Sequence, residues 1–169
     1  DLDRYNFSVR NTTSMLNDKL TMDLSFMYSN VKEQNMLSQG EYANPLVPVY
    51  LVPRGDDFSK YQYYERYDVD RNIKTQFWPL KENGLSMQNP YWITNRNMYT
   101  NKKDRFLASG SLKYTITDWL NVSGRVKLDK ETINSEKKMY ASTLNVIAEN
   151  SDKGAYVQSN KNTSQIYAD

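Results

Sequence analysis

The segment Leu20-Thr-Met-Asp-Leu-Ser-Phe-Met-Tyr28 decides the fold class of this chain. Apolar side chains occupy every even position of the segment, and most of the residues between them are polar. An alternation with a period of two is typical of a β-strand that has one apolar face and one polar face. The segment therefore predicts a strand over about residues 19–31.

A matching strand is expected just before it, over about residues 5–16. Asn17-Asp18 predicts a tight hairpin turn between the two strands. This turn would bring the apolar residues of both strands to one face. The predicted pairs are Met15 with Leu20, Val9 with Phe26 and Phe7 with Tyr28, while Asn11 and Thr13 are polar residues on the same face.

A second hairpin is expected about a hundred residues later, with strands over about 104–116 and 119–131. A three-residue turn, Thr117-Asp118-Trp119, keeps the apolar residues of these two strands on one face, because it pairs Tyr114 with Val122. The chain then resumes alternation over 163–169. We interpret this last segment as the start of a fifth strand, and the chain as a fragment of a larger protein.

The connections between the expected strands alternate between short and long. The two tight turns contrast with long stretches over about 32–103 and 132–162. Outer-membrane barrels have short turns at one end of the strands and long extracellular loops at the other. Alternation alone would serve equally well for a soluble sheet with one wet face.

Composition excludes several classes of function. The chain contains no cysteine and no histidine, which removes thiol catalysis, imidazole acid–base chemistry and their metal sites. Its net charge of +2 favours no nucleic-acid partner. We predict a protein that is not an enzyme and that uses no cofactor and no metal.

The first long connection carries twelve aromatic residues between Tyr42 and Tyr99 and all five prolines of the chain. The prolines argue against long helices or central strands there. Aromatic rings with a polar tip can bind sugars or peptides, but they also pack a long loop on itself. The candidate contact residues for a ligand or a lid protein are Tyr61, Tyr63, Tyr64, Trp78, Tyr91 and Trp92.

Other motifs carry little weight. Asp68-Val-Asp-Arg-Asn72 begins like a calcium loop, but Ile73 and Pro79 occupy positions that require glycine and glutamate. Three glycosylation sequons fall mainly inside expected strands, and we assign them no function. Paired carboxylates such as Asp56-Asp57 could act on glycosidic bonds, but adjacency in sequence does not set the spacing between carboxyl groups that this chemistry needs, and we interpret the pair as part of a solvated loop.

Several phrases in order resemble one family, the SusC/RagA TonB-dependent outer-membrane transporters of Bacteroidetes-type bacteria. The phrases are Tyr5-Asn-Phe-Ser-Val-Arg-Asn11, Leu16-Asn-Asp-Lys-Leu20, Asn44-Pro-Leu-Val-Pro-Val-Tyr50, Pro53-Arg-Gly-Asp-Asp57, Gln88-Asn-Pro-Tyr-Trp92, Lys103-Asp-Arg105 and Ile116-Thr-Asp-Trp-Leu-Asn-Val-Ser-Gly124. The resemblance implies an all-β fold in which antiparallel strands form part of a transmembrane barrel of about 22 strands. It also implies import of glycans or peptides, a SusD-like lipoprotein lid, and energy from TonB through a plug domain absent from this sequence.

This interpretation predicts which side chains would meet lipid and which would meet water. Asn121, Ser123, Arg125 and Lys127 would face a wet lumen. The residues expected to face lipid are Leu20, Met22, Leu24, Phe26, Val122, Val126 and Leu128. A soluble, aromatic-rich carbohydrate-binding β module is the alternative, and a glycosidase based on carboxylates is a third hypothesis.

Overall fold

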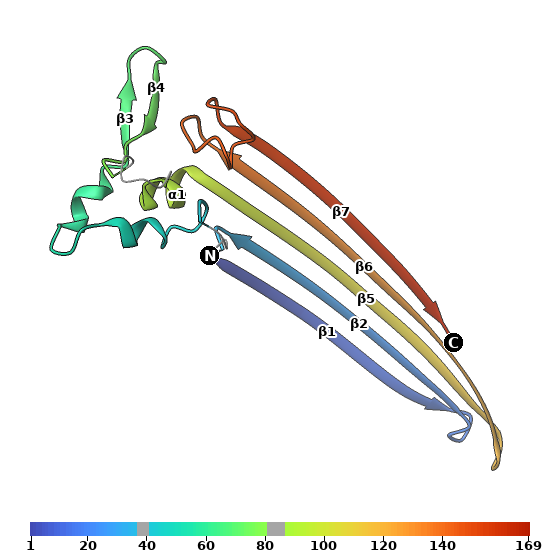
Figure 1. Ribbon diagram of the computed structural model, residues 1–169. Coiled ribbons are helices and arrows are strands. Elements are labelled where there is room, and N and C mark those ends of the chain that lie inside the picture. The colour runs from blue at the N-terminus through green and yellow to red at the C-terminus, as the bar shows by residue number, and fades with distance from the viewer. Residues whose placement is uncertain (37–40, 81–86) are drawn as a thin grey trace. The chain divides into compact units, whose positions relative to one another are not determined.

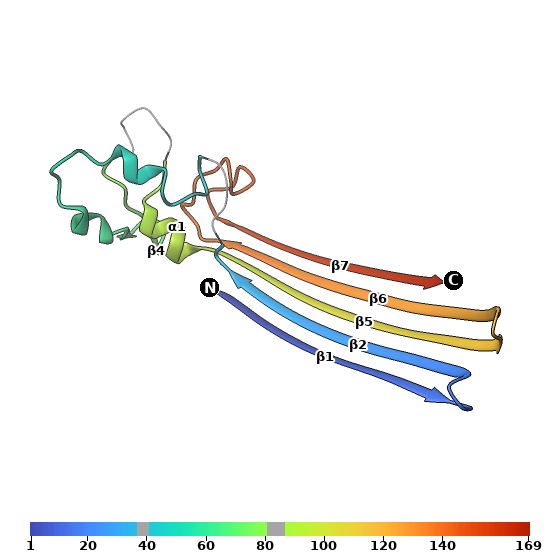
Figure 2. The same cartoon turned by 90° about the horizontal axis from the view of Figure 1, so that it is seen from below.

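The computed structural model describes residues 1–36, 41–80 and 87–169, and these form an all-β, mostly antiparallel structure (Figure 1). Five long strands lie side by side in one sheet, in the order β1-β2-β5-β6-β7, and Figure 2 shows the same order from a second side. The strands are β1 (Leu2–Met15), β2 (Leu20–Gln34), β5 (Asn97–Thr117), β6 (Leu120–Met139) and β7 (Ala155–Ala168). The sheet is open, with β1 and β7 as its edges.

The chain divides into two compact units. Residues 2–33, 101–134 and 159–169 form the sheet unit, which contains most of each long strand. Asp1 and residues 34–100 and 135–158 form the connection unit, which contains the irregular segments and the adjoining strand ends.

The first hairpin confirms the predicted register. Met15 pairs with Leu20, Val9 with Phe26 and Phe7 with Tyr28. Asn17 and Asp18 have φ angles of 55° and 66°, and the amide of Lys19 donates to the carbonyl of Leu16 over 3.2 Å. Positive φ at both central residues is what a tight hairpin turn of this kind requires, and asparagine and aspartate tolerate it.

The second hairpin keeps the predicted alternation of its faces. β5 ends at Thr117 and β6 begins at Leu120, so the strand bounds leave two residues between them where three were predicted. A direct pairing of Thr117 with Leu120 would set odd-numbered residues of one strand against even-numbered residues of the other. The ion pair between Arg105 and Asp129 instead places odd-numbered residues of both strands on one face, and the amide of Tyr140 donates to the carbonyl of Arg96, as the register of the three-residue turn requires.

The long connections are shorter than predicted. The first spans 35–96 rather than 32–103, and the second spans 140–154 rather than 132–162. The fifth strand accordingly begins at Ala155 rather than near residue 163. Polar side chains occupy both faces of the added strand ends, so those ends have no hydrophobic period that a sequence could reveal.

The connection unit contains only short elements among its described residues. They are the 3₁₀ helices η1 (Pro48–Leu51) and η2 (Phe58–Gln62), the hairpin β3 (Glu65–Asp68) and β4 (Ile73–Gln76), and the helix α1 (Pro90–Arg96). Asn89 caps α1 by accepting a hydrogen bond from the amide of Tyr91, and Pro90 occupies the first turn, where no amide proton is needed. Asp57 caps η2 in the same way through the amide of Ser59.

Candidate functional site

One face of the sheet unit is apolar and uncovered. The rings of Phe7, Phe26 and Phe106 form a row across three strands, with centroids 6.2 Å and 4.8 Å apart. Val9 on β1 and Val126 on β6 are 57% and 55% exposed. Contiguous exposed apolar patches of this kind mark surfaces that contact a membrane or a partner.

The side chains predicted to face lipid lie on this apolar face. Leu24, Val122 and Val126 are exposed, and Leu20, Met22, Phe26 and Leu128 are half-buried. Ala108, Gly110 and Leu128 line the same shallow depression as Val9 and Val126, which joins four strands in one surface. Contact with lipid remains a prediction.

The opposite face of the sheet unit is polar and cross-linked by ion pairs. The pairs are Arg10–Asp23 at 2.8 Å, Lys103–Glu131 at 2.8 Å, Arg105–Asp129 at 2.6 Å and Arg125–Asp169 at 2.7 Å. The hydroxyls of Ser25 and Ser109 also share a hydrogen bond of 2.7 Å on this face. The sheet therefore separates an apolar surface from a charged and hydrated one.

The connection unit has a small aromatic core. Trp92 on α1 is fully buried, and its indole Nε1 donates to the hydroxyl of Thr143 over 3.1 Å. The ring of Tyr61 lies 5.3 Å from that of Trp78, and both residues are buried. Tyr64 meets Trp92 edge to face at 6.5 Å. This packing joins segments that lie far apart in the sequence.

The six predicted contact residues therefore divide into two groups. Tyr61, Trp78 and Trp92 are buried side chains that build the core of the connection unit. Tyr63 is 63% exposed beside Phe77, whereas Tyr64 and Tyr91 are half-buried. Exposure leaves Tyr63 as the residue best placed to contact a ligand or a lid protein.

Two buried amides hold the core in place, and sequence analysis had missed them. The side chain of Asn89 donates to the carbonyls of Tyr61 and Phe77 over 2.9 Å and 3.1 Å. Gln88 donates to the carbonyl of Tyr42 and accepts from the amide of Leu144, each over 3.1 Å. The pattern Asn89-Pro90 was the available signal, because asparagine before proline is a frequent start of a helix.

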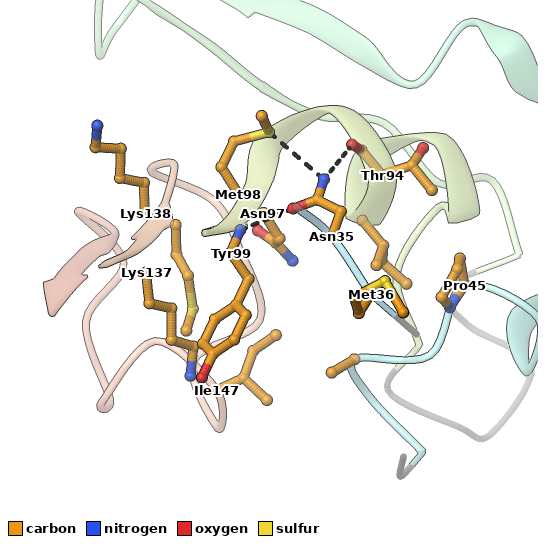
Figure 3. Close-up of a pocket in the computed structure, with 13 residues that line it drawn as sticks. Asn35, Met36, Pro45, Thr94, Asn97, Met98, Tyr99, Lys137, Lys138 and Ile147 are labelled. Carbon is orange, nitrogen blue, oxygen red and sulfur yellow. Dashed lines mark hydrogen bonds between the residues drawn. The ribbon is translucent and has the colours of Figure 1, made fainter. Parts of the chain in front are cut away.

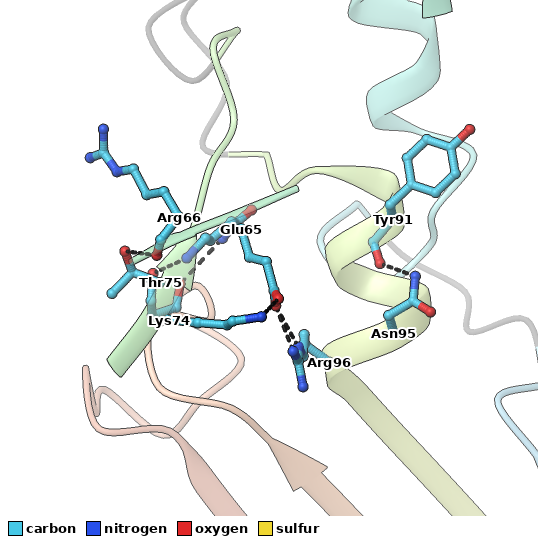
Figure 4. A network of polar contacts seen from close by, with 9 residues as sticks. Glu65, Arg66, Lys74, Thr75, Tyr91, Asn95 and Arg96 are labelled. Carbon is cyan, nitrogen blue, oxygen red and sulfur yellow. Dashed lines mark hydrogen bonds and ion pairs between the residues drawn. The ribbon is translucent and has the colours of Figure 1, made fainter. Parts of the chain in front are cut away.

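A charged network ties β3 and β4 to the end of α1 (Figure 4). Glu65 accepts from Arg96 Nη2 and Lys74 Nζ, each over 2.6 Å, and also from Arg96 Nε over 2.9 Å. Burial acts to raise the pKa of Glu65, but these hydrogen bonds outweigh burial and hold the pKa below its ordinary value. The same contact raises the pKa of Arg96, which also lies over the ring of Tyr140.

A cavity of about 110 Å³ lies in the connection unit, where the ends of β5 and β6 meet the first connection (Figure 3). Asn35 spans one wall and donates to the carbonyl of Thr94 over 3.0 Å and to Met98 Sδ over 3.6 Å. The remaining walls are mainly apolar, with Met36, Met139 and Ile147 among them. Such a lining suits an apolar group better than a sugar, whose hydroxyls need polar partners.

No protein-family model matches this chain, and no curated protein matches it.

The described residues contain no helix long and apolar enough to cross a membrane. Within the same residues, no group of three or more carboxylates is placed to hold a metal ion.

Proposed function

We propose that this chain is a segment of the β-barrel of a SusC/RagA-type TonB-dependent transporter in a bacterial outer membrane. Such a transporter imports oligomeric nutrients, either glycans or peptides, and catalyses no reaction. The remainder of the barrel would pair with the edge strands β1 and β7, because backbone groups at membrane depth must be satisfied.

The uncovered apolar sheet face is the observation that carries this proposal. Water penalises an apolar face that stays exposed, whereas the acyl chains of a membrane accept it. The ion-paired opposite face would line the aqueous interior of the barrel. The strands of 14 to 21 residues exceed the roughly 9 to 11 that cross a bilayer, so their outer ends would extend beyond the lipid.

The long connections would then stand outside the cell, since they join the strand ends that are not joined by the two tight turns. A SusD-like lipoprotein lid and the imported cargo would meet them there, while TonB would act through a plug domain elsewhere in the protein. Tyr63 is the exposed anchor that we assign to the lid or the cargo. Tyr64 and Tyr91 are secondary candidates because they are half-buried.

Cysteine scanning along β6 tests the proposal. This chain has no cysteine, so a single one introduced at each position from 120 to 128 is the only one within it, and any cysteine elsewhere in the full protein is replaced first. Nitroxide labels at even positions should be accessible to oxygen dissolved in lipid, and labels at odd positions to a water-soluble nickel reagent. The protein should be produced in full in a bacterial host and analysed in isolated outer membranes.

Other outcomes would reject the proposal. A protein found in the aqueous fraction, with every label equally accessible to nickel, would instead support the carbohydrate-binding module. For the loop, Tyr63→Ala should weaken cargo or lid binding without reducing the amount of assembled protein. Tyr50→Ala is the matched control, because Tyr50 is 89% exposed and has no ring partner among the described aromatic residues.

A further inference from the structure

The apolar face of the sheet unit changes character partway along the strands. Phe26 on β2 and Phe106 on β5 are in contact, and the next residues on the same face are Tyr28 and Asp104. Tyr28 and Asn30 both donate to the carboxylate of Asp104 over 2.7 Å. The apolar surface therefore ends at the phenylalanine row, and a polar surface begins directly beyond it.

Three lysines lie on this polar extension. Successive side chains of a strand point to opposite faces, so Lys32 shares the face of Asn30, and Lys102 shares the face of Asp104. Lys130 lies between Asp129 and Glu131, which pair with Arg105 and Lys103 on the opposite face. We call Lys32, Lys102 and Lys130 the lysine row.

The lysine row occupies a short stretch of the sheet. Asn30 contacts Asp104, so Lys32 and Lys102 are each the next residue on that face away from the tight turns. Lys130 lies closer to the phenylalanine row, because Asp129 and Glu131 pair with Arg105 and Lys103 and the amide of Tyr140 donates to the carbonyl of Arg96. It is therefore one to two residues of the same face nearer to the tight turns than the other two lysines.

Charged side chains of the polar face form ion pairs, whereas the three lysines of the opposite face form none among the described residues. The polar face has four ion pairs between neighbouring strands, whereas the described residues of the lysine row have no ion pair within 4.0 Å. All three lysines are exposed. The carboxylates near them are Asp104, which is already hydrogen-bonded by Tyr28 and Asn30, and Asp3, which is opposite Lys32 in the register.

Polar side chains continue this surface along β6 and on its neighbour β7. Thr132 donates to Asn162 over 2.8 Å, and Asn160 donates to Asn134. Amide and hydroxyl groups of this kind bind sugar hydroxyls, and lysine binds phosphate as a point charge. The surface therefore offers both chemistries at the edge of an apolar band.

We propose that the lysine row binds the phosphate groups of anionic glycolipids in the outer leaflet beside the barrel. This inference rests on the proposed membrane location of the apolar band. Acyl chains covering the phenylalanine row would bring the lipid headgroups to the polar extension of the same face, which carries the three lysines. Lysines near an anionic lipid surface each contribute about a fivefold gain in affinity.

Glycolipid retention by the intact purified protein tests the inference. A triple variant, Lys32→Gln, Lys102→Gln and Lys130→Gln, is compared with a control variant, Lys113→Gln, Lys127→Gln and Lys161→Gln. The control removes the same charge from the opposite face, where those exposed lysines also lack ion pairs within the described residues. Phosphate analysis and mass spectrometry would count the phosphorylated glycolipid kept per protein after detergent purification.

The lysine-row variant should retain severalfold less glycolipid than the parent, and the control should retain the parental amount. Equal retention by both variants and the parent, or equal loss in both variants, would overturn the inference. A matching variant with arginine at all three positions should restore retention, and single glutamine variants replace the triple variant if it assembles poorly. Absence of the parent protein from the outer membrane would reject the proposed function, whereas normal localisation with unchanged retention would reject the lysine row alone.

Discussion

The sheet unit and the connection unit place their apolar side chains in opposite ways. The sheet unit exposes Val9, Val126 and Phe7 on one face and is held together by the backbone ladder and by ion pairs on the other face. The connection unit buries Trp92 and Trp78 and uses Asn89 and Gln88 to satisfy the backbone of irregular segments. Cohesion therefore comes from the backbone ladder and surface ion pairs in one unit and from a buried side-chain core in the other.

Trp92→Ala should produce the largest effect and should confine it to the connection unit. The indole is fully buried, and truncating a buried tryptophan costs about 3–5 kcal/mol. Limited proteolysis should cleave the variant rapidly between residues 41 and 80, while the strands of the sheet unit keep their protection from hydrogen exchange. An equal loss of hydrogen-exchange protection in both units would show that the two units depend on the same interactions.

Val126→Arg should have the next largest effect and should confine it to the sheet unit. If the apolar face meets lipid, a charge near mid-membrane costs about 2–4 kcal/mol, and less protein should assemble in the outer membrane. Lys127→Arg is the control, because the neighbouring side chain belongs to the opposite face and keeps its charge. Equal amounts of assembled protein for the two variants would contradict the assignment of the faces.

Gly154→Ala should destabilise the end of the second connection through backbone crowding. Gly154 has a φ of +88°, and an added Cβ would lie 2.3 Å from the carbonyl oxygen of Met139. Conformational strain of this kind costs about 1–3 kcal/mol. Thermal unfolding of the variant should therefore begin at a lower temperature than that of the parent protein.

Gly55→Ala separates crowding from backbone conformation. Gly55 has a similar φ of +87°, but an added Cβ would meet no atom within 4 Å. Alanine there should cost only the energy of the positive φ, so its effect should be smaller than at Gly154. A larger loss of stability in Gly55→Ala than in Gly154→Ala would show that crowding against Met139 is not what destabilises the Gly154 variant.

Sequence patterns could predict the sheet unit more fully than the connection unit. The register from Phe7–Tyr28 to Met15–Leu20 followed from alternation and one turn, because both are local properties of the chain. The outer strand ends carried polar residues on both faces and gave no period to detect. Completion of a barrel of about 22 strands stays a prediction, because the described residues form one open sheet.

The connection unit could not be predicted in detail because its contacts join distant segments. Trp92 meets Thr143, and Gln88 meets both Tyr42 and Leu144. The sequence of a long loop does not show whether an aromatic ring in it is buried or exposed. Trp92 and Tyr63 were therefore equally good candidates for contact with a ligand or a lid protein. Only the folded structure distinguishes the core residue from the exposed one.

Glu65→Gln should produce the smallest effect, and its pH dependence should identify it. The Glu65 side chain is 16% exposed and has a lowered pKa in the folded protein, so its ion pairs stabilise the fold above the ordinary glutamate pKa of about 4.3. This contribution disappears as the pH falls through the lowered pKa. The parent should therefore be more stable than the variant at pH 7, by about 1 kcal/mol, because the variant loses hydrogen bonds to a charged group. This difference in stability should shrink below about pH 4.

Hydrogen-exchange protection of the amides of β3 and β4, corrected for the intrinsic effect of pH, measures this difference. Lys74→Gln is the control, because the Lys74 side chain is 62% exposed and solvent should screen most of its pair with Glu65. A pH-independent difference between Glu65→Gln and the parent would mean that the carboxylate acts only through its shape. Hydrogen-exchange protection in the sheet unit should be unchanged in both variants. This result would show that the charged network stabilises the connection unit alone, where the loss of one partner loosens only the segments that it joins.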